Sequence, residues 1–348
     1  MGLFKEGGEH QIQDLGNDQY NLTISIPADE SGRMARECPS QECSPGYFKV
    51  TPGTGVIGGQ ALAYCPYCRH EAEPSDFATQ EQIRYAKDMA LREAHKGVND
   101  MVRNTFGLGS SGRKKLGGGF LSMEISYKPG SLPYVHRPFE DEVRRDVICP
   151  HCTLDQTVFG LATWCADCGE DIFMTHIEAE LAVTRLMLED VERRQDQLGK
   201  RVAAKDLENC LEDVVSIYEA AIRAIVRRAM IIRGDSSELI ETTFKKLGNA
   251  FQNIDRTQKE LNSLFGKNAL NEDVLEKLKS AFEKRHPITH NLGVIDRKYM
   301  ERTKELEQEG REIRLSAEEI SQALFDAKTA ISDIYEKLIK GYSGQDFA

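Results

Sequence analysis

Eight of the nine cysteines stand in four close pairs, and this spacing constrains the fold more than any other feature of the chain. Two thiolates on one tight turn can reach the same metal ion, and two such turns complete a tetrahedron of ligands around zinc. We therefore expect two structural zinc ions. The expected ligands are Cys38, Cys43, Cys65 and Cys68 for the first ion, and Cys149, Cys152, Cys165 and Cys168 for the second.

Short runs of strand-forming residues flank the cysteine pairs. Residues 47–50 and 61–64 surround a loop rich in Gly and Pro, and residues 157–159 and 161–164 lie on either side of Gly160. Strands that alternate with tight metal-binding turns are typical of zinc ribbons. The sequence therefore predicts two small β zinc ribbons in the first half of the chain.

Other roles for the cysteines are less consistent with the sequence. Disulfides form in oxidising compartments, whereas the N-terminus carries no apolar signal segment. A catalytic zinc keeps an open position, whereas four thiolates close the coordination shell. His70, His151 or His176 is close enough in sequence to replace one ligand. Cys210, the remaining cysteine, lies in a helical pattern and is expected to be a small buried apolar residue.

The charge of the chain limits its partners. With 45 Lys and Arg against 56 Asp and Glu, the net charge is −11, so any contact with a nucleic acid must be local. Residues 241–300 have such a local excess, with 11 basic and 8 acidic side chains. No apolar run reaches the length of about eighteen residues that a membrane-spanning helix needs. We expect a cytoplasmic protein without a membrane segment.

The chain is predicted to be a multidomain α+β protein in which the two ribbons precede an all-α helical bundle. Thr79–Gln82 and Ser316–Glu319 match the capping box that begins a helix. Apolar residues from Ile177 to Val202 follow a heptad pattern. The expected parts are a first ribbon plus helix over 1–106, a Gly-rich linker over 107–119, the second ribbon over 120–176, a connecting helix over 177–204 and the bundle over 205–348.

Helical periodicity also predicts the elements of the bundle. One helix is expected over 206–233, a second over 238–265, a third from the cap Asn271 and a fourth from Ser316. The third should be broken at Pro287 and again at Gly293, because proline removes a backbone donor and glycine favours a helix end.

Polar residues cluster at the end of the third helix, where four residues separate Arg285 from His290 and His286 follows the arginine. With Gly293 and Asp296 downstream, the motif resembles that of the HEPN superfamily: an Arg, a polar residue, three more positions and a His at the end of a helix. The resemblance covers about residues 205–341. It implies a HEPN-like helical fold for this part of the chain.

Active HEPN proteins are metal-independent endoribonucleases, so the resemblance implies an RNA substrate. The catalytic residues would be Arg285, His290 and His286. A histidine can exchange a proton with a ribose hydroxyl or a leaving oxygen, and an arginine can stabilise charge on the phosphate. The resemblance also implies a homodimer through the C-terminal helices. A toxin or anti-phage effector is the biological role by analogy with the family.

Two other functions remain open from the sequence. The chain is a non-catalytic adaptor if the zinc ribbons bind a protein partner and the helical bundle only dimerises. It is a nucleic-acid-binding protein if the ribbons contact a phosphate backbone. Basic and acidic residues are mixed around the cysteines, so the charges near the ribbons do not decide between these functions.

Overall fold

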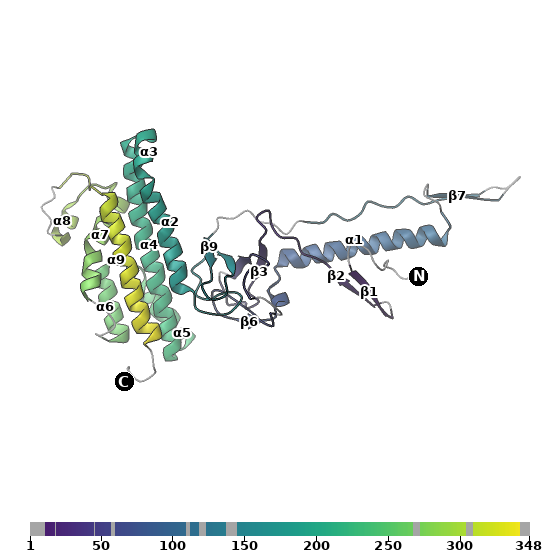
Figure 1. Cartoon of the computed structure of the whole chain (residues 1–348), viewed down its shortest axis with the longest axis horizontal. Coiled ribbons are helices and arrows are strands. Elements are labelled where there is room, and N and C mark those ends of the chain that lie inside the picture. Colours follow the sequence, from purple (N-terminus) through teal and green to yellow (C-terminus); the bar gives the residue numbers. More distant parts are fainter. Residues whose placement is uncertain are drawn as a thin grey trace. The chain divides into compact units, whose positions relative to one another are not determined.

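The computed structural model describes two compact units (Figure 1). The first comprises residues 1–144, 151–159 and 165–169, and the second comprises 145–150, 160–164 and 170–348. Small antiparallel sheets lie in the N-terminal region and most helices follow them, so the chain is of mixed α+β class. The described residues are 11–17, 19–44, 46–56, 60–108, 112–117, 123–136, 145–266, 272–303 and 309–341.

The first unit contains β4 (Tyr47–Val50), an inner strand of a sheet. It pairs antiparallel with β3 (Met34–Glu37) on one side and with β10 (Asp155–Val158) on the other. The sequence predicts β4 and β10 as strands of two separate ribbons, whereas here they are neighbours in one sheet. A shorter pair, β5 (Ala63–Tyr64) and β6 (Glu71–Ala72), carries the turn between Cys65 and Cys68.

Helix α1 (Gln80–Thr105) follows the turn η1 (Pro74–Phe77) and begins as predicted. The Thr79 hydroxyl accepts from the Gln82 N–H at 3.2 Å, and the Gln82 side chain accepts from the Thr79 N–H at 3.0 Å. The Gln82 amide also donates to the Ala35 carbonyl at 2.9 Å, which attaches the start of α1 to β3. The capping box is confirmed, and it also positions the helix on the sheet.

Two hairpins complete the first unit. Strands β1 (Gln11–Gly16) and β2 (Gln19–Thr23) form one of them. Strands β7 (Arg113–Leu116) and β8 (Met123–Ser126) form the other, and β7 lies inside the segment predicted to be a Gly-rich linker. The Tyr127 hydroxyl donates to the Asn99 side chain at 2.5 Å and so attaches this hairpin to α1. Residues 109–111, 118 and 119 of this linker segment lie outside the described residues, as do 120–122.

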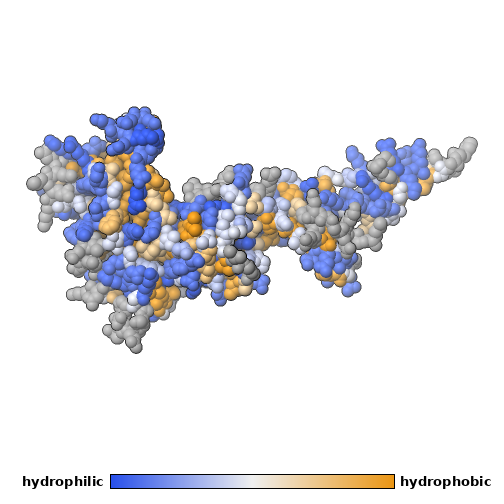
Figure 2. All heavy atoms as spheres, viewed as in Figure 1, coloured by the Kyte–Doolittle hydropathy of each residue, from blue (hydrophilic) through white to orange (hydrophobic). Residues whose placement is uncertain are grey.

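The second unit is a helical bundle around α4 (Lys200–Arg233), which contacts α2, α7 and α9. Buried side chains of α4 such as Val214, Ile222 and Ile225 form the centre of the core. On the face drawn in Figure 2, the end of the unit that carries α3 is hydrophilic. The other elements are β9 (Arg145–Ile148), α2 (Phe173–Glu189), α3 (Val191–Leu198), α5 (Ser237–Leu247), η2 (Ala250–Gln252), α6 (Ile254–Phe265), α7 (Glu272–Asn291), α8 (Arg297–Thr303), α9 (Ala317–Tyr335) and η3 (Glu336–Lys340).

Two helices predicted as continuous are broken. The segment 177–204 contains α2, α3 and the start of α4, and Gly199 between the last two has φ of 93°. Ile177, Leu181 and Leu188 lie in the core of the unit, so the heptad pattern packs against this bundle. The segment 238–265 is interrupted after Leu247 by Gly248, whose φ is 52°. Glycine adopts these left-handed conformations without a side-chain clash.

The break predicted at Pro287 is wrong, because α7 continues through this residue to Asn291. The helix ends where Leu292 and Gly293 take positive φ values of 53° and 81°. The Gly293 N–H donates to the Pro287 carbonyl at 2.9 Å, which gives one of the last carbonyls of the helix a partner. Arg285 and His290 therefore lie on one continuous helix. The predicted cap Asn271 lies outside the described residues.

Helix α9 begins with the predicted capping box. The Ser316 side chain accepts from the Glu319 N–H at 3.2 Å, and the Glu319 carboxylate accepts from the Ser316 N–H at 3.1 Å. Among the described residues, no helix combines the length and the apolar content that crossing a membrane requires.

Candidate functional site

The first four predicted zinc ligands form one cluster. The sulfur atoms of Cys38, Cys43, Cys65 and Cys68 all lie within 4.8 Å of one another. The Cys38 and Cys68 sulfurs are 3.7 Å apart, and those of Cys43 and Cys65 are 3.6 Å apart. Sulfur ligands at about 2.3 Å from a tetrahedral zinc ion are separated by about 3.8 Å, whereas a disulfide bond measures about 2.0 Å. The cluster therefore fits one zinc ion.

The second predicted set forms a similar cluster. The sulfurs of Cys149, Cys152, Cys165 and Cys168 lie within 4.8 Å of one another, and Cys152 and Cys165 are 3.5 Å apart. Both clusters contain four thiols and no other metal-ligating side chain among the described residues. Closed shells of this kind suit a structural ion rather than a catalytic one.

The turns that begin at Cys65 and Cys165 share a backbone arrangement. The N–H of Tyr67 points to the Cys65 sulfur at 3.5 Å, and the N–H of Asp167 points to the Cys165 sulfur at 3.4 Å. Amide donors of this kind stabilise thiolates. Burial raises the pKa of the Cys43 thiol to about 12, so a bound cation would be needed to favour its ligating thiolate form.

The histidines considered as substitute ligands belong to neither cluster. His176 is buried, and its Nδ1 accepts from the Ala162 N–H at 2.8 Å. The His70 ring lies 6.5 Å from the Phe77 ring, measured between centroids. His151 is also outside both groups. Cys210 is fully buried in the bundle core, as its helical pattern predicts.

Arg285, His286 and His290 line one hollow of ≈ 650 Å³ on the second unit. Since a helix turns about 100° per residue, His286 and His290 share a face of α7, whereas Arg285 and His290 point about 140° apart. The two imidazole rings are 4.9 Å apart between centroids. The two histidine rings thus lie side by side, and Arg285 borders the same hollow.

The Arg285 side chain is held from the opposite wall of the hollow. Its Nη1 donates to Gln252 Oε1 at 3.1 Å, and the Gln252 amide in turn donates to Glu219 at 2.7 Å. The Arg285 Nε is buried and has no hydrogen-bond partner among the described residues. The guanidinium therefore retains donor capacity beside the two histidines.

The hollow carries an excess of positive charge. Lys279 pairs with Asp255 at 2.8 Å and Arg302 pairs with Glu283 at 3.2 Å. The remaining cations that line it are Arg256, Arg285 and Lys298, and none of them has an ion pair within the part of the chain that the structure describes. A site with three such cations attracts an anion. Of these three cations, only Arg285 belongs to the motif predicted from the sequence. Arg256 and Lys298 come from α6 and α8.

The surroundings of His286 favour its neutral form. Partial burial lowers the pKa of His286, and the charges of Arg302, His290 and Lys298 lower it further. A positive charge on one imidazole of the pair also disfavours a second on the other. At neutral pH the pair can therefore contain an unprotonated ring that accepts a proton.

No protein-family model, curated protein or solved structure matches this chain. The HEPN resemblance and the catalytic roles of Arg285, His286 and His290 stay predictions. The geometry of the described residues supports the two cysteine clusters as metal sites and the basic hollow as an anion site.

Proposed function

We propose that the second unit is a metal-independent RNA endonuclease of HEPN type that acts as a homodimer. The observation that supports this function is the hollow lined by the charged side chain of Arg285 and by the paired rings of His286 and His290. A phosphodiester is an anion that an arginine fork can bind, and imidazoles transfer protons near neutral pH. The zinc-binding part would dock or sense, as in a toxin or anti-phage effector.

The proposed reaction uses the ribose 2′-hydroxyl as the nucleophile. Neutral His286 takes the hydroxyl proton while the 2′ oxygen attacks phosphorus, and the bond from phosphorus to the 5′ oxygen breaks. Protonated His290 gives its proton to that leaving oxygen, so the products are a 2′,3′-cyclic phosphate and a 5′-hydroxyl end. Arg285 stabilises the negative charge that grows on the phosphoryl oxygens.

Cleavage of labelled single-stranded RNA by the full chain tests the proposal. The buffer contains EDTA at a concentration that leaves the measured zinc content of the protein unchanged. Loss of a general acid or base, or of a group that stabilises the transition state, slows such reactions by about 10²-fold or more. The variants His290→Ala, His286→Ala and Arg285→Ala should each cleave RNA more slowly by about this factor. His95→Ala on α1 and Arg297→Ala, which does not line the hollow, should cleave like the unmodified protein.

Intact RNA in every sample would contradict the nuclease proposal and leave the adaptor function as its alternative. Sedimentation velocity of the same variants tests the dimer separately. A dimer that persists in His290→Ala while cleavage stops would assign the loss to chemistry rather than to assembly. A monomer that cleaves at the full rate would contradict the homodimer.

A second candidate function, nucleic-acid binding by the first unit, is favoured by the hairpin of β7 and β8. All four residues of β7 are exposed, including Arg113, Lys114 and Lys115. Residues 101–130 contain five basic side chains and one acidic side chain in a chain of net charge −11. Binding without cleavage, weakened steeply by salt and by substitution of these three cations, would support this function.

A further inference from the structure

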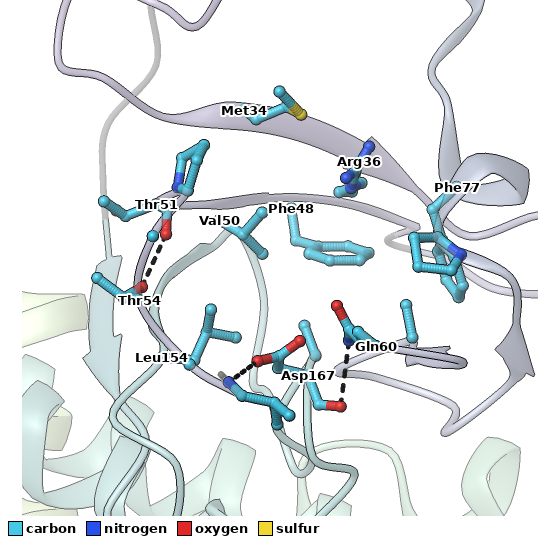
Figure 3. Close-up of a pocket in the computed structure, with 17 residues that line it drawn as sticks. Met34, Arg36, Phe48, Val50, Thr51, Thr54, Gln60, Phe77, Leu154 and Asp167 are labelled. Carbon is cyan, nitrogen blue, oxygen red and sulfur yellow. Dashed lines mark hydrogen bonds between the residues drawn. The ribbon is translucent and has the colours of Figure 1, made fainter. Parts of the chain in front are cut away.

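A pocket of ≈ 480 Å³ in the first unit has one wall formed by β3 and β4. Met34 pairs with Val50 and Arg36 pairs with Phe48 across these strands. Because side chains at alternate positions share a face of a sheet, these four side chains lie on the same face. Figure 3 shows this face bordering the pocket. An arginine is thus placed among apolar residues.

The opposite wall contains one acidic group, Asp167. The Asp167 carboxylate accepts from the backbone N–H of Val56, and the Gln60 amide donates to the Asp167 carbonyl at 3.3 Å (Figure 3). Leu154 adds a further apolar side chain to this wall. Pockets for small molecules have volumes of roughly 300–1,000 Å³, apolar walls and few polar groups. The volume of this pocket lies in that range, and Met34, Phe48, Val50, Phe77 and Leu154 give it apolar wall segments.

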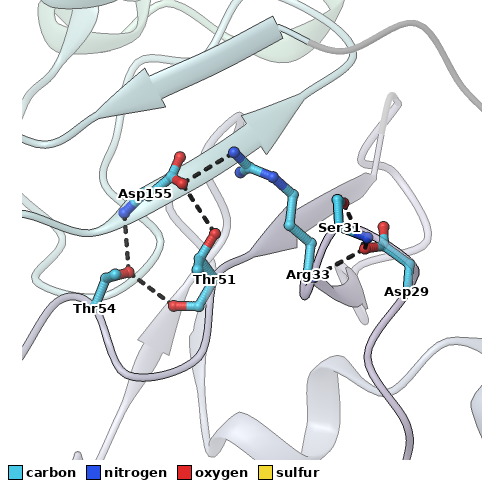
Figure 4. A network of polar contacts seen from close by, with 6 residues as sticks. All are labelled: Asp29, Ser31, Arg33, Thr51, Thr54 and Asp155. Atoms are coloured by element: carbon cyan, nitrogen blue, oxygen red, sulfur yellow. Dashed lines mark hydrogen bonds and ion pairs between the residues drawn. The ribbon is translucent and has the colours of Figure 1, made fainter.

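Arg36 differs from two other basic residues nearby, Arg33 just before β3 and Lys49 in β4. Arg33 is 8% exposed and lies 2.9 Å from Asp155, and Lys49 is 4% exposed and lies 3.2 Å from Asp29 (Figure 4 shows the first pair). Arg36 is partly buried, and its side chain has no hydrogen bond or ion pair within the described ranges.

A charge taken out of water is costly unless an opposite charge compensates it. Both buried neighbours of Arg36 obey this rule with a carboxylate of the chain itself. No carboxylate among the described residues pairs with Arg36, so its charge is open to an anion from outside them. The Arg36 side chain lines an open pocket, so a bound ligand can supply this anion.

We propose that this pocket binds a small organic acid whose carboxylate pairs with Arg36 and whose apolar body packs on Phe48, Val50 and Leu154. A carboxylate matches the planar fork of a guanidinium. A phosphate would need several donors, whereas Arg36 is the one cationic side chain among the described lining residues. The inference does not depend on the proposed nuclease, because it concerns the other unit.

Ligand-observed NMR titrations of the zinc-loaded full chain test the ligand chemistry. The probes are phenylacetate, the neutral isostere phenylacetamide and acetate, which lacks the apolar body. A hydrogen bond to a charged group contributes about 1.5–3 kcal/mol, so phenylacetate should bind at least about tenfold more tightly than phenylacetamide. Acetate should also bind more weakly, because it cannot fill the apolar walls. Equal binding of phenylacetate and phenylacetamide would overturn the proposal.

Variants test the location of the site. Arg36→Gln should weaken phenylacetate binding about tenfold or more and leave phenylacetamide binding unchanged. Val56→Trp, at a lining position that is 43% exposed, should block both probes by filling the pocket. Arg92→Gln on α1 is the control and should bind like the unmodified protein. Zinc content reports whether each variant is folded.

The two pocket variants keep the proposal testable if one of them fails to fold. Unchanged phenylacetate binding in a folded Arg36→Gln protein would exclude the arginine as the anion site. If Arg36→Gln loses its zinc, Val56→Trp decides, and unchanged binding by that variant would place the probe outside this pocket and overturn the proposal.

Discussion

The Arg33 guanidinium lies 2.9 Å from the Asp155 carboxylate, although 122 positions separate the two residues (Figure 4). The same carboxylate oxygen accepts from the Thr51 hydroxyl at 3.0 Å. The Asp155 backbone N–H donates to the Thr54 hydroxyl at 3.1 Å. Asp155 therefore connects β10 to the loop after β4 and to the segment before β3, and it compensates a buried cation.

Asp155→Ala should destabilise the sheet of the first unit. The substitution leaves Arg33, which is 8% exposed, without its carboxylate, and we expect a cost of about 2 kcal/mol. Hydrogen–deuterium exchange of β3, β4 and β10 should become about thirtyfold faster at the most protected amides. Asp100→Ala, at an exposed position of α1, is the control and should leave these amides unchanged. Unchanged exchange in Asp155→Ala would show that the ion pair is energetically neutral.

Asp29 should make the first unit sensitive to acid. Burial acts to raise the pKa of Asp29, but hydrogen bonds from Ser31, Arg33 and Lys49 outweigh it and lower the pKa to about 2. A carboxyl with a pKa of about 3.9 in the unfolded chain then contributes about 2 kcal/mol above pH 4, and this contribution is lost as the pH falls toward 2.

Urea unfolding monitored by exchange in the sheet, for the unmodified protein and Asp29→Asn, measures this contribution. Asp29→Asn should be less stable at pH 6, and the difference should shrink below pH 4. Proton-driven loss of zinc affects both proteins, so only their difference reports on Asp29. A difference that is constant from pH 6 to pH 2 would argue against the lowered pKa.

Gly55→Ala should disturb the pocket loop more than Gly53→Ala. Both glycines have positive φ, 92° at Gly55 and 86° at Gly53, so either substitution strains the backbone by about 1 kcal/mol. A Cβ at Gly55 would also clash with the Asp167 carboxylate, whereas a Cβ at Gly53 meets no atom within 4 Å. Exchange at the Val56 amide should therefore increase more in Gly55→Ala. Equal effects would show that strain alone matters.

Zinc content should follow the two cysteine clusters. The purified chain should bind two zinc ions, one for each tetracysteine group. Cys65→Ser and Cys165→Ser should each reduce the measured content to about one ion per chain, because a structural site rarely tolerates the loss of a thiolate. Cys210→Ser changes a buried thiol outside both clusters and should leave the content at two. Atomic emission spectroscopy of the dialysed protein measures the number of zinc ions per chain.

Features that depend on neighbouring residues could be predicted from the sequence. The cysteine groups follow from pairs only a few positions apart, and the caps at Thr79 and Ser316 follow from four-residue patterns. The predicted helix break at Pro287 was wrong because it relied only on the low helix preference of proline. The helix tolerates the proline, since packing and the cap at Gly293 fix its last turn.

Features that depend on distant residues could not be predicted. The pairing of β4 with β10 joins residues about one hundred positions apart, and neither strand contains a signal for its partner. The basic hollow was missed for the same reason, because Arg256 and Lys298 come from helices other than the one that carries Arg285. Arg36 became a candidate only when the strand register placed it on an apolar face.

The pairing of β4 with β10 also sets an order of events during synthesis of the protein. A ribosome has completed β4 long before it adds residue 155, so the central strand waits with one edge unpaired while roughly a hundred further residues are made. An unpaired edge is a site for wrong pairing with other chains. Nascent chains stalled before residue 155 should therefore need chaperones to protect this edge. Nascent chains that extend past β10 should no longer need them.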